Sequence, residues 1–544
     1  MSTHADTDGR DSSPAKPRAQ SGAKLRDWAP LRLAKAGLRR VFDRLERGAD
    51  RLFSPALNPL AQLGAISFFL FWVVAVSGVY LFIFFDTGVV NAYSSVEWIS
   101  GAHWYHAGVM RSLHRYASDL MVASMALHLL REFSLDRYRG VRWFSWFTGV
   151  PLIWFLYMSG ITGYWLVWDM LAQYVALVSA KLLDVFPIFG EPLARNFLTP
   201  QHLSSRFFSL LVFLHIAIPL ILLLRMWIHI QRISRLLAGL VLAALLAVAL
   251  WKPALSQGPA DLTKLPAVLG LDWFYLPLYP LAEAWNGWSI WALLVGVSTM
   301  LAAMPWLPPL RRAPAAQVDL PNCNGCNRCV EDCPYEAIRL VPRTDGAPFA
   351  RQAQVSPDLC VACGICMGAC PSSTPFRRAQ DLKTGIDLPG QPLAEVRDQV
   401  AAAAAGLAGN ARVLVLACEH GAGGGDAGNG VVAFPCVAMV PPPLIDYILS
   451  RELADGVVVA GCGESACYNR LGVEWTKQRF AGTRDPYLRK RVPRERLATI
   501  WASPFEAGRY EAEKAAFSAR LETLEKTEPP AARQGAEEGL EEEA

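Results

Sequence analysis

Charge is scarce in this chain of 544 residues. Asp, Glu, Lys and Arg make up 18% of the residues, and the formal net charge is only +4. So small a charge gives no electrostatic basis for nucleic-acid binding, and the arginines gather instead beside apolar segments. The sequence also lacks a nucleophile–base arrangement, a phosphate loop and a dinucleotide fingerprint, because the glycine-rich stretch 421–430 precedes no evident helix. We therefore expect neither a bound flavin nor a bound nicotinamide.

A secretory signal is also missing from the first residues. Residues 1–24 are polar, without an apolar core or a cleavage-site pattern, and predict a disordered tail. In residues 25–55, apolar side chains follow helical spacing among many arginines. This pattern predicts a basic amphipathic helix on an anionic membrane surface. The alternative is a solvated helix that packs on the soluble part of the protein.

Hydrophobic residues, by contrast, make up 53% of the chain, with 18 Trp. Runs long enough to cross a bilayer are 62–86, 108–131, 147–170, 207–230, 234–252 and 287–308, of which the fifth is short. They predict an all-α transmembrane bundle of about six spans over residues 56–312. Arginines follow the second, fourth and sixth spans, and the basic helix precedes the first. With six spans all four clusters fall on one side, which the positive-inside rule makes the cytoplasm.

Four histidines form two pairs with one spacing. His114 and His128 lie 14 residues apart in the second span, and His215 and His229 in the fourth. Fourteen residues are nearly four helical turns, so each pair occupies one helix face, about 21 Å apart along the axis. Two such helices side by side offer two facing histidine pairs, which suits two haems ligated on both axial sides. The alternative for a single membrane histidine is a polar contact inside the bundle.

Other residues repeat this pattern. Arg111 precedes His114 by three residues and Arg131 follows His128 by three, so their guanidinium groups are candidates for pairing with haem propionates. Glycines with the same 14-residue step are Gly64 and Gly78 in the first span and Gly149 and Gly163 in the third. A glycine leaves room for a flat macrocycle, although ordinary helix packing is the alternative.

The membrane part resembles cytochrome b of quinol-oxidising respiratory and photosynthetic complexes. The third span, GITGYWLVWDMLAQYVA, is similar to the stretch that borders the family's quinol oxidation site, and LTPQHLSSRFF is similar to the entry to its fourth helix. The resemblance implies that His114 and His215 hold one haem b and that His128 and His229 hold the other. It also implies a homodimer through this region.

The loop between the fifth and sixth spans contains the sequence Leu-Asp-Trp-Phe-Tyr at 271–275. It resembles the family's Pro-Glu-Trp-Tyr element, with Asp272 at the acidic position and Leu271 in place of the proline. The resemblance implies a quinone site with Asp272 and Tyr275 as catalytic residues, since a carboxylate can accept the proton that leaves a quinol. We expect Trp273 to be structural. The alternatives are an interfacial aromatic belt here, or a quinone pocket nearer the cytoplasmic haem.

A second strong motif follows in residues 313–385. The spacing C-x-x-C-x-x-C-x-x-x-C-P occurs twice, as in bacterial two-cluster ferredoxins, whose fourth cysteine serves the other cluster. The predicted [4Fe–4S] ligand sets are Cys323, Cys326, Cys329 and Cys370 for one cluster and Cys360, Cys363, Cys366 and Cys333 for the other. The fold implied is an α+β ferredoxin-like domain. Zinc is the competitor, disfavoured by eight cysteines with both prolines, and a reducing cytoplasm disfavours disulfides.

After a linker at 386–411, residues 412–510 predict a small α/β domain with buried strands. Its cysteines are Cys418, Cys436, Cys462 and Cys467, which can hold one [2Fe–2S] cluster. GCGESACYNRLG resembles an element of the delta subunit of methyl-viologen-reducing hydrogenases. That family often carries a second cysteine at the position of Gly421, so Cys436 or His420 would complete the set here. Buried apolar cysteines are the alternative. Residues 511–544 predict a helix and an acidic tail.

Together these patterns predict a multidomain, multi-pass protein of the cytoplasmic (inner) membrane with its iron–sulfur domains in the cytoplasm. It would link the quinone pool, through two b haems and three clusters, to a cytoplasmic flavoprotein like that of heterodisulfide reductase or to a dehydrogenase. One alternative is a quinol-driven, membrane-potential-assisted reductant of a low-potential acceptor. Another is a non-catalytic membrane anchor and redox sensor. The direction of electron flow stays open, because potentials depend on burial and on hydrogen bonds around each centre.

Overall fold

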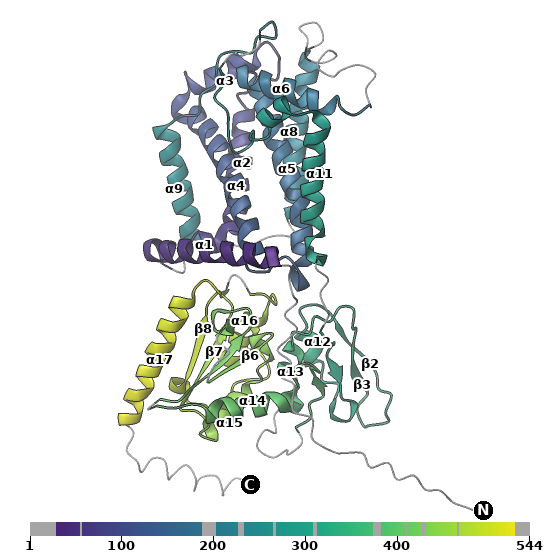
Figure 1. The fold of residues 1–544 in the computed structure, drawn as a ribbon, viewed down its shortest axis with the longest axis vertical. Coiled ribbons are helices and arrows are strands. Elements are labelled where there is room, and N and C mark those ends of the chain that lie inside the picture. The colour runs from purple at the N-terminus through teal and green to yellow at the C-terminus, as the bar shows by residue number, and fades with distance from the viewer. Residues whose placement is uncertain are drawn as a thin grey trace, which may run out of the picture.

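The chain has a helical part and an α/β part, placed end to end (Figure 1). This computed structural model describes residues 29–54, 57–187, 198, 203–226, 233–264, 268–307, 313–373, 382–409, 411–425, 430–464 and 467–527. The helices of the first part are α1 (Ala29–Phe53), α2 (Leu63–Phe82), α3 (Ala92–Ser100), α4 (Val109–Ser134), α5 (Trp143–Val167), α6 (Met170–Leu183), α8 (Ser205–Met226), α9 (Arg235–Trp251), α10 (Tyr279–Ala284) and α11 (Gly287–Ala303).

Four helical segments of this part are long and apolar enough to cross a membrane. They are Leu60–Phe82, Gly140–Val167, Ser205–Leu224 and Gly287–Trp306. Two further helices lie alongside them in Figure 1. α4 has 26 residues but carries charges, and α9 is apolar but has only 17 residues. The six spans expected from the sequence correspond to these six helices, and six crossings stay a prediction.

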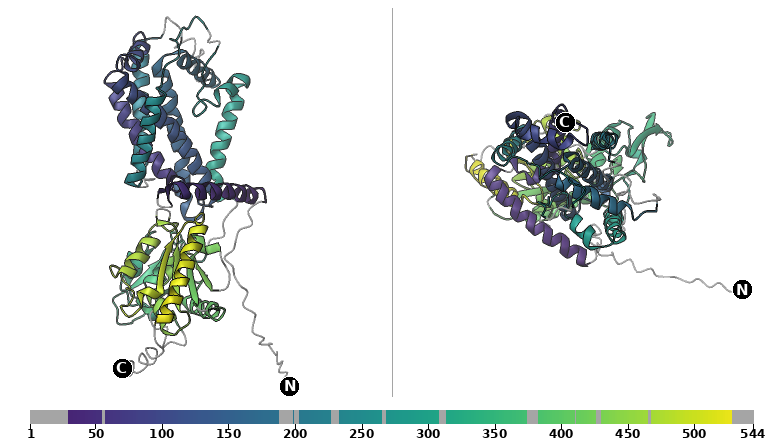
Figure 2. Two further views of the ribbon diagram at one scale, coloured as in Figure 1. Left: turned by 90° about the vertical axis from the view of Figure 1, so that its left-hand side faces the viewer. Right: turned by 90° about the horizontal axis from the view of Figure 1, so that it is seen from above.

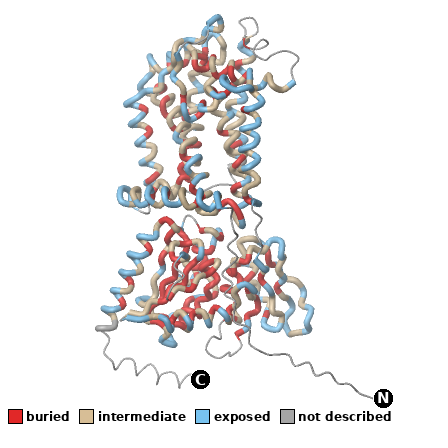
Figure 3. Tube along the Cα trace, viewed as in Figure 1, coloured by how far each residue is buried: buried red, intermediate tan, exposed pale blue. Residues whose placement is uncertain are grey.

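The surface of the bundle supports a membrane setting. Large apolar side chains on α2, α8 and α11 are exposed, among them Val79, Leu224 and Val295. The helix α11, at the right of the bundle, is largely pale blue in Figure 3. A soluble monomer rarely leaves so much contiguous apolar surface uncovered. Exposure of these apolar side chains is unfavourable in water but not in the lipid of a membrane.

The third span ends earlier than its apolar run suggests. α5 stops at Val167, and Trp168 takes the left-handed conformation with φ 51°. Asp169 then caps α6, its side chain accepting the N–H of Ala172 at 2.8 Å. The run 147–170 is therefore one long helix followed by a sharp turn into α6, which lies at the end of the bundle far from the α/β part (Figure 1).

α1 lies across the boundary between the two parts in both side views (Figures 1 and 2). Its contacts are Lys35 with Asp136 at 2.6 Å, Glu46 with Arg131 at 2.7 Å, and the ring of Phe42 with that of Phe505 at 6.2 Å. Leu33, Val41, Leu45 and Leu52 stay exposed beside its many arginines. One face thus packs on both parts of the protein, and the other offers the apolar and basic surface expected of a membrane-surface helix.

The ferredoxin-like region contains two small antiparallel sheets. Its elements are β1 (Gln317–Val318), α12 (Arg328–Glu331), β2 (Ile338–Pro342), β3 (Arg351–Val355), α13 (Ile365–Ala369) and β4 (Ile386–Asp387). β2 pairs with β3, and β1 pairs with β4. β4 belongs to the segment expected to be a linker, so this part of the linker completes the ferredoxin-like region.

The two cysteine runs have the same backbone. Gly325 and Asn327 in the first run have φ of +66° and +71°, and Ala362 and Gly364 at the matching places in the second have +56° and +74°. Residues in the left-handed backbone conformation at equivalent positions turn each loop around its cysteines. The sequence repeat is therefore a structural repeat.

The last region is built on a parallel sheet with strand order β6-β5-β7-β8. Its elements are α14 (Leu393–Ala405), β5 (Val413–Cys418), β6 (Val431–Phe434), α15 (Pro442–Ser450), β7 (Gly456–Gly461), α16 (Gly472–Ala481), β8 (Leu497–Trp501) and α17 (Ala507–Thr527). The β7 strand is wholly buried, which explains its continuous apolar run. α17 packs Phe517 and Leu521 against Gly456, so the helix after residue 510 is part of this core.

Candidate functional site

The first histidine of each pair faces the other across the bundle. His114 on α4 and His215 on α8 have ring centroids 6.3 Å apart. Each Nδ1 lies 3.0 Å from a backbone carbonyl oxygen, that of Val74 for His114 and that of Ser159 for His215. Nδ1–H donation to a carbonyl fixes the tautomer and leaves Nε2 free to bind a metal. Two metal–nitrogen bonds of about 2 Å, with the two ring radii, span this separation, so the pair fits a haem iron.

Glycines make room for these rings. A Cβ on Gly78 of α2 would lie 3.0 Å from Cε1 of His114, and one on Gly163 of α5 would lie 2.9 Å from Cε1 of His215. The sequence suggested that these glycines admit a macrocycle, whereas their neighbours here are the imidazoles. Gly64 and Gly149 lie about four turns away on the same helices, toward the α/β part.

His128 lies on α4, also toward the α/β part. Its predicted partner His229 lies outside the described residues, and the second haem site is left as a prediction. Arg131 forms its ion pair with Glu46, and Arg111 donates hydrogen bonds to Ser100 and, at 2.8 Å, to Oγ of Ser256. Both arginines expected to pair with haem propionates thus have protein partners.

Asp272 lies in a polar network inside the bundle and is only 8% exposed. Its carboxylate accepts the N–H of Phe274 at 2.7 Å, pairs with Nη2 of Arg115 at 2.7 Å, and accepts the hydroxyl of Tyr164. Arg115 also pairs with Asp119 at 3.1 Å. Two carboxylates therefore share one arginine, which directly follows the haem-ligand candidate of α4.

Asp119 was not identified from the sequence as a site residue. The available signal was a carboxylate inside a membrane segment, which is rare and usually functional. Its link to Asp272 became visible only in the fold, which brings residues 119 and 272 to the same arginine.

Tyr275 is buried, and Trp273 is not. The Tyr275 hydroxyl lies 2.6 Å from Oγ of Ser118, and its ring fills the space that a Gly160 side chain would occupy. Trp273 is 69% exposed. The indole of Trp273 therefore contributes little to the protein's own core, whereas Tyr275 packs inward, and the structural role expected of Trp273 stays a prediction.

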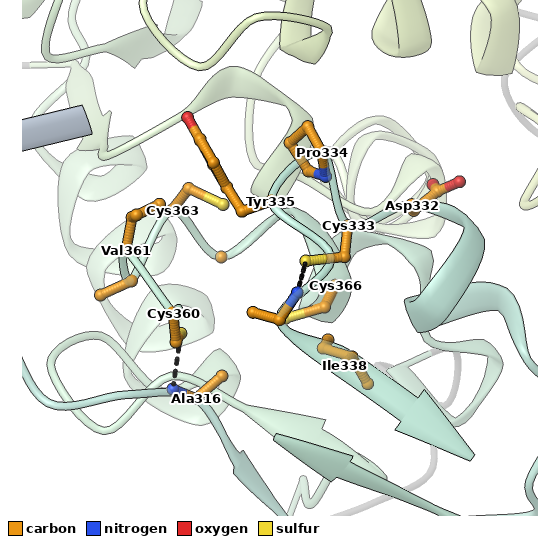
Figure 4. Close-up of a pocket in the computed structure, with 13 residues that line it drawn as sticks. Ala316, Asp332, Cys333, Pro334, Tyr335, Ile338, Cys360, Val361, Cys363 and Cys366 are labelled. Atoms are coloured by element: carbon orange, nitrogen blue, oxygen red, sulfur yellow. Dashed lines mark hydrogen bonds between the residues drawn. The ribbon is translucent and has the colours of Figure 1, made fainter. Parts of the chain in front are cut away.

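The eight ferredoxin-like cysteines line two separate cavities. The first is lined by Cys323, Cys326, Cys329 and Cys370. The second is lined by Cys333, Cys360, Cys363 and Cys366 (Figure 4). Each cavity takes three cysteines from one run and the fourth from the other. These are the two sets that the ferredoxin spacing predicts.

The second cavity already offers hydrogen bonds to sulfur. The N–H of Ala316 lies 3.5 Å from Sγ of Cys360, and that of Ala337 lies 3.2 Å from Sγ of Cys333 (Figure 4). Burial raises the pKa of Cys363 to about 12, and burial raises that of Cys329 in the first cavity to about 12 as well. At neutral pH these thiols alone would stay protonated, and bound iron would supply the positive charge that keeps them as thiolates.

The last four cysteines gather at one edge of the parallel sheet. Cys418 ends β5, Cys436 follows β6, Cys462 follows β7, and Cys467 lies in the turn before α16. The carboxyl ends of parallel strands share one edge, the usual place for a ligand site. Sγ of Cys418 lies 3.6 Å from Sγ of Cys462. Sγ of Cys436 and Sγ of Cys467 lie 2.4 and 3.6 Å from the place of a Gly472 Cβ.

The departure from the hydrogenase-delta pattern has a steric explanation. A Cβ on Gly421 would lie 2.7 Å from the carbonyl oxygen of Gly461, so a cysteine does not fit there. The ring of His420 stacks on Tyr468 at 3.6 Å, and burial, with Arg137 and Arg142 nearby, lowers its pKa to about 4. His420 is therefore neutral at pH 7, which is the form of an imidazole that can bind a metal. Cys436 lies at the same edge as the other three cysteines, so Cys436 and His420 both stay candidates for completing the set.

Buried cationic groups also face this edge. Nη2 of Arg137 and Nε of Arg142 are buried and have no hydrogen-bond partner within the part of the chain that the structure describes. Another group of Arg142 donates to the carbonyl oxygen of Cys467. Glu132 provides one negative charge near these arginines, and a thiolate-ligated cluster would add negative charge on the side of the cysteines. The donor set therefore fits an iron–sulfur centre.

Comparisons with known families divide the chain in the same way. Residues 49–236 match cytochrome b/b6/petB, residues 322–374 match the 4Fe-4S dicluster domain, and residues 426–525 match the delta subunit of methyl-viologen-reducing hydrogenase. Cys418 lies before the last match. A solved chain titled "Hyperthermophilic respiratory Complex III" is similar at 17% identity, over 46% of this chain and 75% of that one, with a TM-score of 0.39. The chain thus joins a cytochrome b-like region, a 4Fe–4S dicluster region and a hydrogenase-delta-like region, in that order.

Proposed function

We propose that this protein is a membrane-bound electron-transfer subunit that links the quinone pool to an oxidoreductase in the cytoplasm. The observation that carries the proposal is the sequence of metal-ligand candidates along the molecule. His114 and His215 lie in the bundle, His128 follows toward the α/β part, and two groups of cysteines lie beyond it. Haem and iron–sulfur groups would supply the redox chemistry, and the side chains hold and tune them.

The polar network around Asp272 is the proposed quinone site. Oxidation of a quinol releases two electrons and two protons, and a carboxylate within reach can accept one of these protons. Arg115 connects Asp272 to the helix of His114, so the proton acceptor lies beside the first haem site. This site lies at the end of the bundle that is far from the cysteines. The arginine distribution assigns that end of the bundle to the outer side of the membrane.

The proposed partner is a cytoplasmic flavoprotein like that of heterodisulfide reductase, or a dehydrogenase attached to one. The support is the likeness of residues 426–525 to a hydrogenase delta subunit. Among the ligand candidates of the first ferredoxin-like cavity, Cys326 is exposed. Because electron transfer needs short distances, this cavity is the natural place for exchange with a soluble partner.

The proposal predicts about ten non-haem iron atoms per chain, from two [4Fe–4S] clusters and one [2Fe–2S] cluster. Cys418→Ser should remove about two iron atoms and the [2Fe–2S] signal in electron paramagnetic resonance, because the 418 thiolate belongs to the separate edge site. Both [4Fe–4S] signals should stay. Loss of a [4Fe–4S] signal in this variant, with no [2Fe–2S] signal in the parent protein, would contradict the assignment.

The full chain in lipid nanodiscs tests the function itself. Anaerobic addition of a short-chain quinol analogue should reduce b haem, followed in the visible absorption bands, and then the iron–sulfur centres, followed by resonance spectra. Dithionite provides the fully reduced reference. If dithionite reduces every centre but neither quinol nor quinone changes the redox state of any of them, the quinone link is wrong.

A further inference from the structure

We propose that the pocket of Cys418, Cys436, Cys462 and Cys467, last in the sequence, is the junction between the membrane part and the ferredoxin-like region. Arg142 and Asn469 are its positioning residues. This inference rests on the proposed function and adds a spatial order that the sequence does not have. Along the chain the ferredoxin-like cysteines come directly after the membrane part, whereas in space the last four cysteines contact both.

On the membrane side, the pocket meets the loop between α4 and α5 (residues 135–142). Arg142 donates a hydrogen bond to the carbonyl oxygen of Cys467. A Cβ on Gly140, whose φ is +61°, would lie 2.8 Å from the hydroxyl of Tyr468, so the loop backbone touches the residue next to Cys467. The loop continues the helix of His128 directly. His128 and the cysteine pocket are thus joined through one short segment.

The contact between the two parts extends beyond this loop. Phe505, which follows β8 of the same sheet, packs on Phe42 of α1 and lies 5.3 Å from the guanidinium of Arg131. Arg131 ends the helix of His128 and is itself paired with Glu46. The carboxyl edge of the sheet is therefore docked on the membrane part at two places, which holds the cysteine pocket in a defined position below it.

On the other side, the pocket meets the ferredoxin-like region through backbone contacts. Cys436 leads into the short helix η10 (Val437–Met439), which packs on α13. A Cβ on Gly368 of α13 would lie 2.2 Å from the carbonyl oxygen of Ala438, and one on Gly364 would lie 2.5 Å from Sδ of Met439. Two glycines thus let α13, which carries Cys366, approach the segment of Cys436 without side chains between them.

Asn469 connects the two cysteine sites. Its Oδ1 accepts the hydroxyl of Tyr335 at 3.0 Å, and its Nδ2 donates to the carbonyl oxygen of Pro435 at 3.2 Å. Tyr335 follows the Cys333-Pro334 pair of the second cavity, and Pro435 precedes Cys436. One amide therefore ties the backbone beside one cysteine site to the backbone beside the other.

A buried ion pair fixes the same interface. Arg479 of α16 is 1% exposed, donates to the carbonyl oxygen of Ala438 at 2.7 Å and pairs with Asp332, the residue before Cys333. Arg484 also donates to Asp332, at 2.8 Å. Separating the buried carboxylate of Asp332 from its two arginines would leave an uncompensated buried charge, which is strongly unfavourable. The two cysteine sites are thus held as one unit.

The consequence is a fixed order of sites from the membrane to the surface. The second haem site comes first, then the last four cysteines, then the second ferredoxin-like cavity, then the first cavity with the exposed Cys326. An electron that moves between the membrane part and the ferredoxin-like region crosses this pocket, one electron at a time, and no bond forms or breaks.

Magnetic interaction tests the order without reference to turnover. In the full chain, reduced completely with dithionite, the spin relaxation of the centre at the last four cysteines should be accelerated by the neighbouring second ferredoxin-like cluster. Cys363→Ser should abolish this acceleration. Cys326→Ser, the matched control in the other cavity, should leave it in place. Acceleration that survives Cys363→Ser and disappears in Cys326→Ser would overturn the proposed order.

Removal of the junction tests its necessity. In Cys462→Ser, quinol should reduce the haems as in the parent protein, but reduction of the [4Fe–4S] centres should slow at least a hundredfold, although dithionite still reduces them. Reduction at the parent rate would overturn the inference and leave the quinone link standing. Absence of haem reduction by quinol in the parent protein would instead count against the proposed function.

Arg142 variants test the positioning role in a chain that keeps all its cysteines. Loss of a buried positive charge beside the centre should favour its oxidised form. Arg142→Ala should therefore lower the one-electron reduction equilibrium constant of the centre about tenfold, which corresponds to a reduction potential about 59 mV lower. Arg142→Lys should restore most of this shift. Arg139→Ala, which removes the loop's pair with Asp136, is the matched control. An unchanged potential in Arg142→Ala would contradict the role of Arg142.

Discussion

His215→Ala will halve the haem content of the purified protein. The iron of the first site would lose one of its two axial imidazoles, and the space between α8 and α5 would lose the ring that Gly163 accommodates. Haem stoichiometry should fall from two to one per chain, and one of two steps in a redox titration of the b haems should disappear. His114→Ala should remove the same step, since both rings face each other at 6.3 Å.

A histidine outside the bundle core provides the control. His106 lies in the short helical segment Trp104–Gly108 before α4, 2.8 Å from the hydroxyl of Tyr80, and His106→Ala should keep both haems. His128→Ala, in the second predicted pair, should remove the other titration step and disconnect quinone from the iron–sulfur centres. If both steps keep full amplitude in the His215 or His128 variant, the ligand assignment is wrong.

Asp272→Asn will slow quinone-dependent haem reduction by about 10² to 10⁴, the usual contribution of a positioned proton acceptor. The amide can still accept the N–H of Phe274, but it cannot take up a proton or balance the charge of Arg115. Haem content, cluster signals and reduction by dithionite should be unchanged. Stopped-flow absorption after mixing with quinol measures the rate.

Asp261→Asn is the matched control, because Asp261 lies in the same loop region but is exposed, and its carboxylate bonds to Thr263 and Lys264 rather than to Arg115. Its quinol rate should equal that of the parent protein. The quinol rate of Asp119→Asn should lie between those of Asp272→Asn and Asp261→Asn. This substitution leaves Asp272 intact but removes the second carboxylate that pairs with Arg115. Parent-like rates in Asp272→Asn across a range of pH would place quinone near the haem of His128 instead.

The metal-ligand candidates could be predicted from the sequence because their chemistry is encoded as spacing. The 14-residue step in α4 needs only the helical repeat to bring both histidines to one face. The two cysteine runs likewise need no distant partner to turn each loop, and the structure places the fourth cysteine of each run in the cavity of the other.

What could not be predicted depends on partners far apart in the sequence. Arg131 was expected near a propionate, and its ion pair with Glu46, 85 residues earlier in the sequence, could not be foreseen. The clash that keeps a cysteine out of position 421 comes from Gly461. Trp273 and Tyr275 are both aromatic loop residues, and only the packing at Gly160 decides which is buried. No local sequence pattern predicts these long-range contacts.

The burial of the last four cysteines constrains how the protein matures. Each is 7% exposed or less, and they lie between the loop that follows α4 and the ferredoxin-like region. A carrier protein that delivers iron and sulfide cannot reach thiols enclosed on both sides. If these cysteines hold a cluster, it has to be inserted before the α/β part closes against the helical part. A chain that folds before loading would be trapped without the cluster.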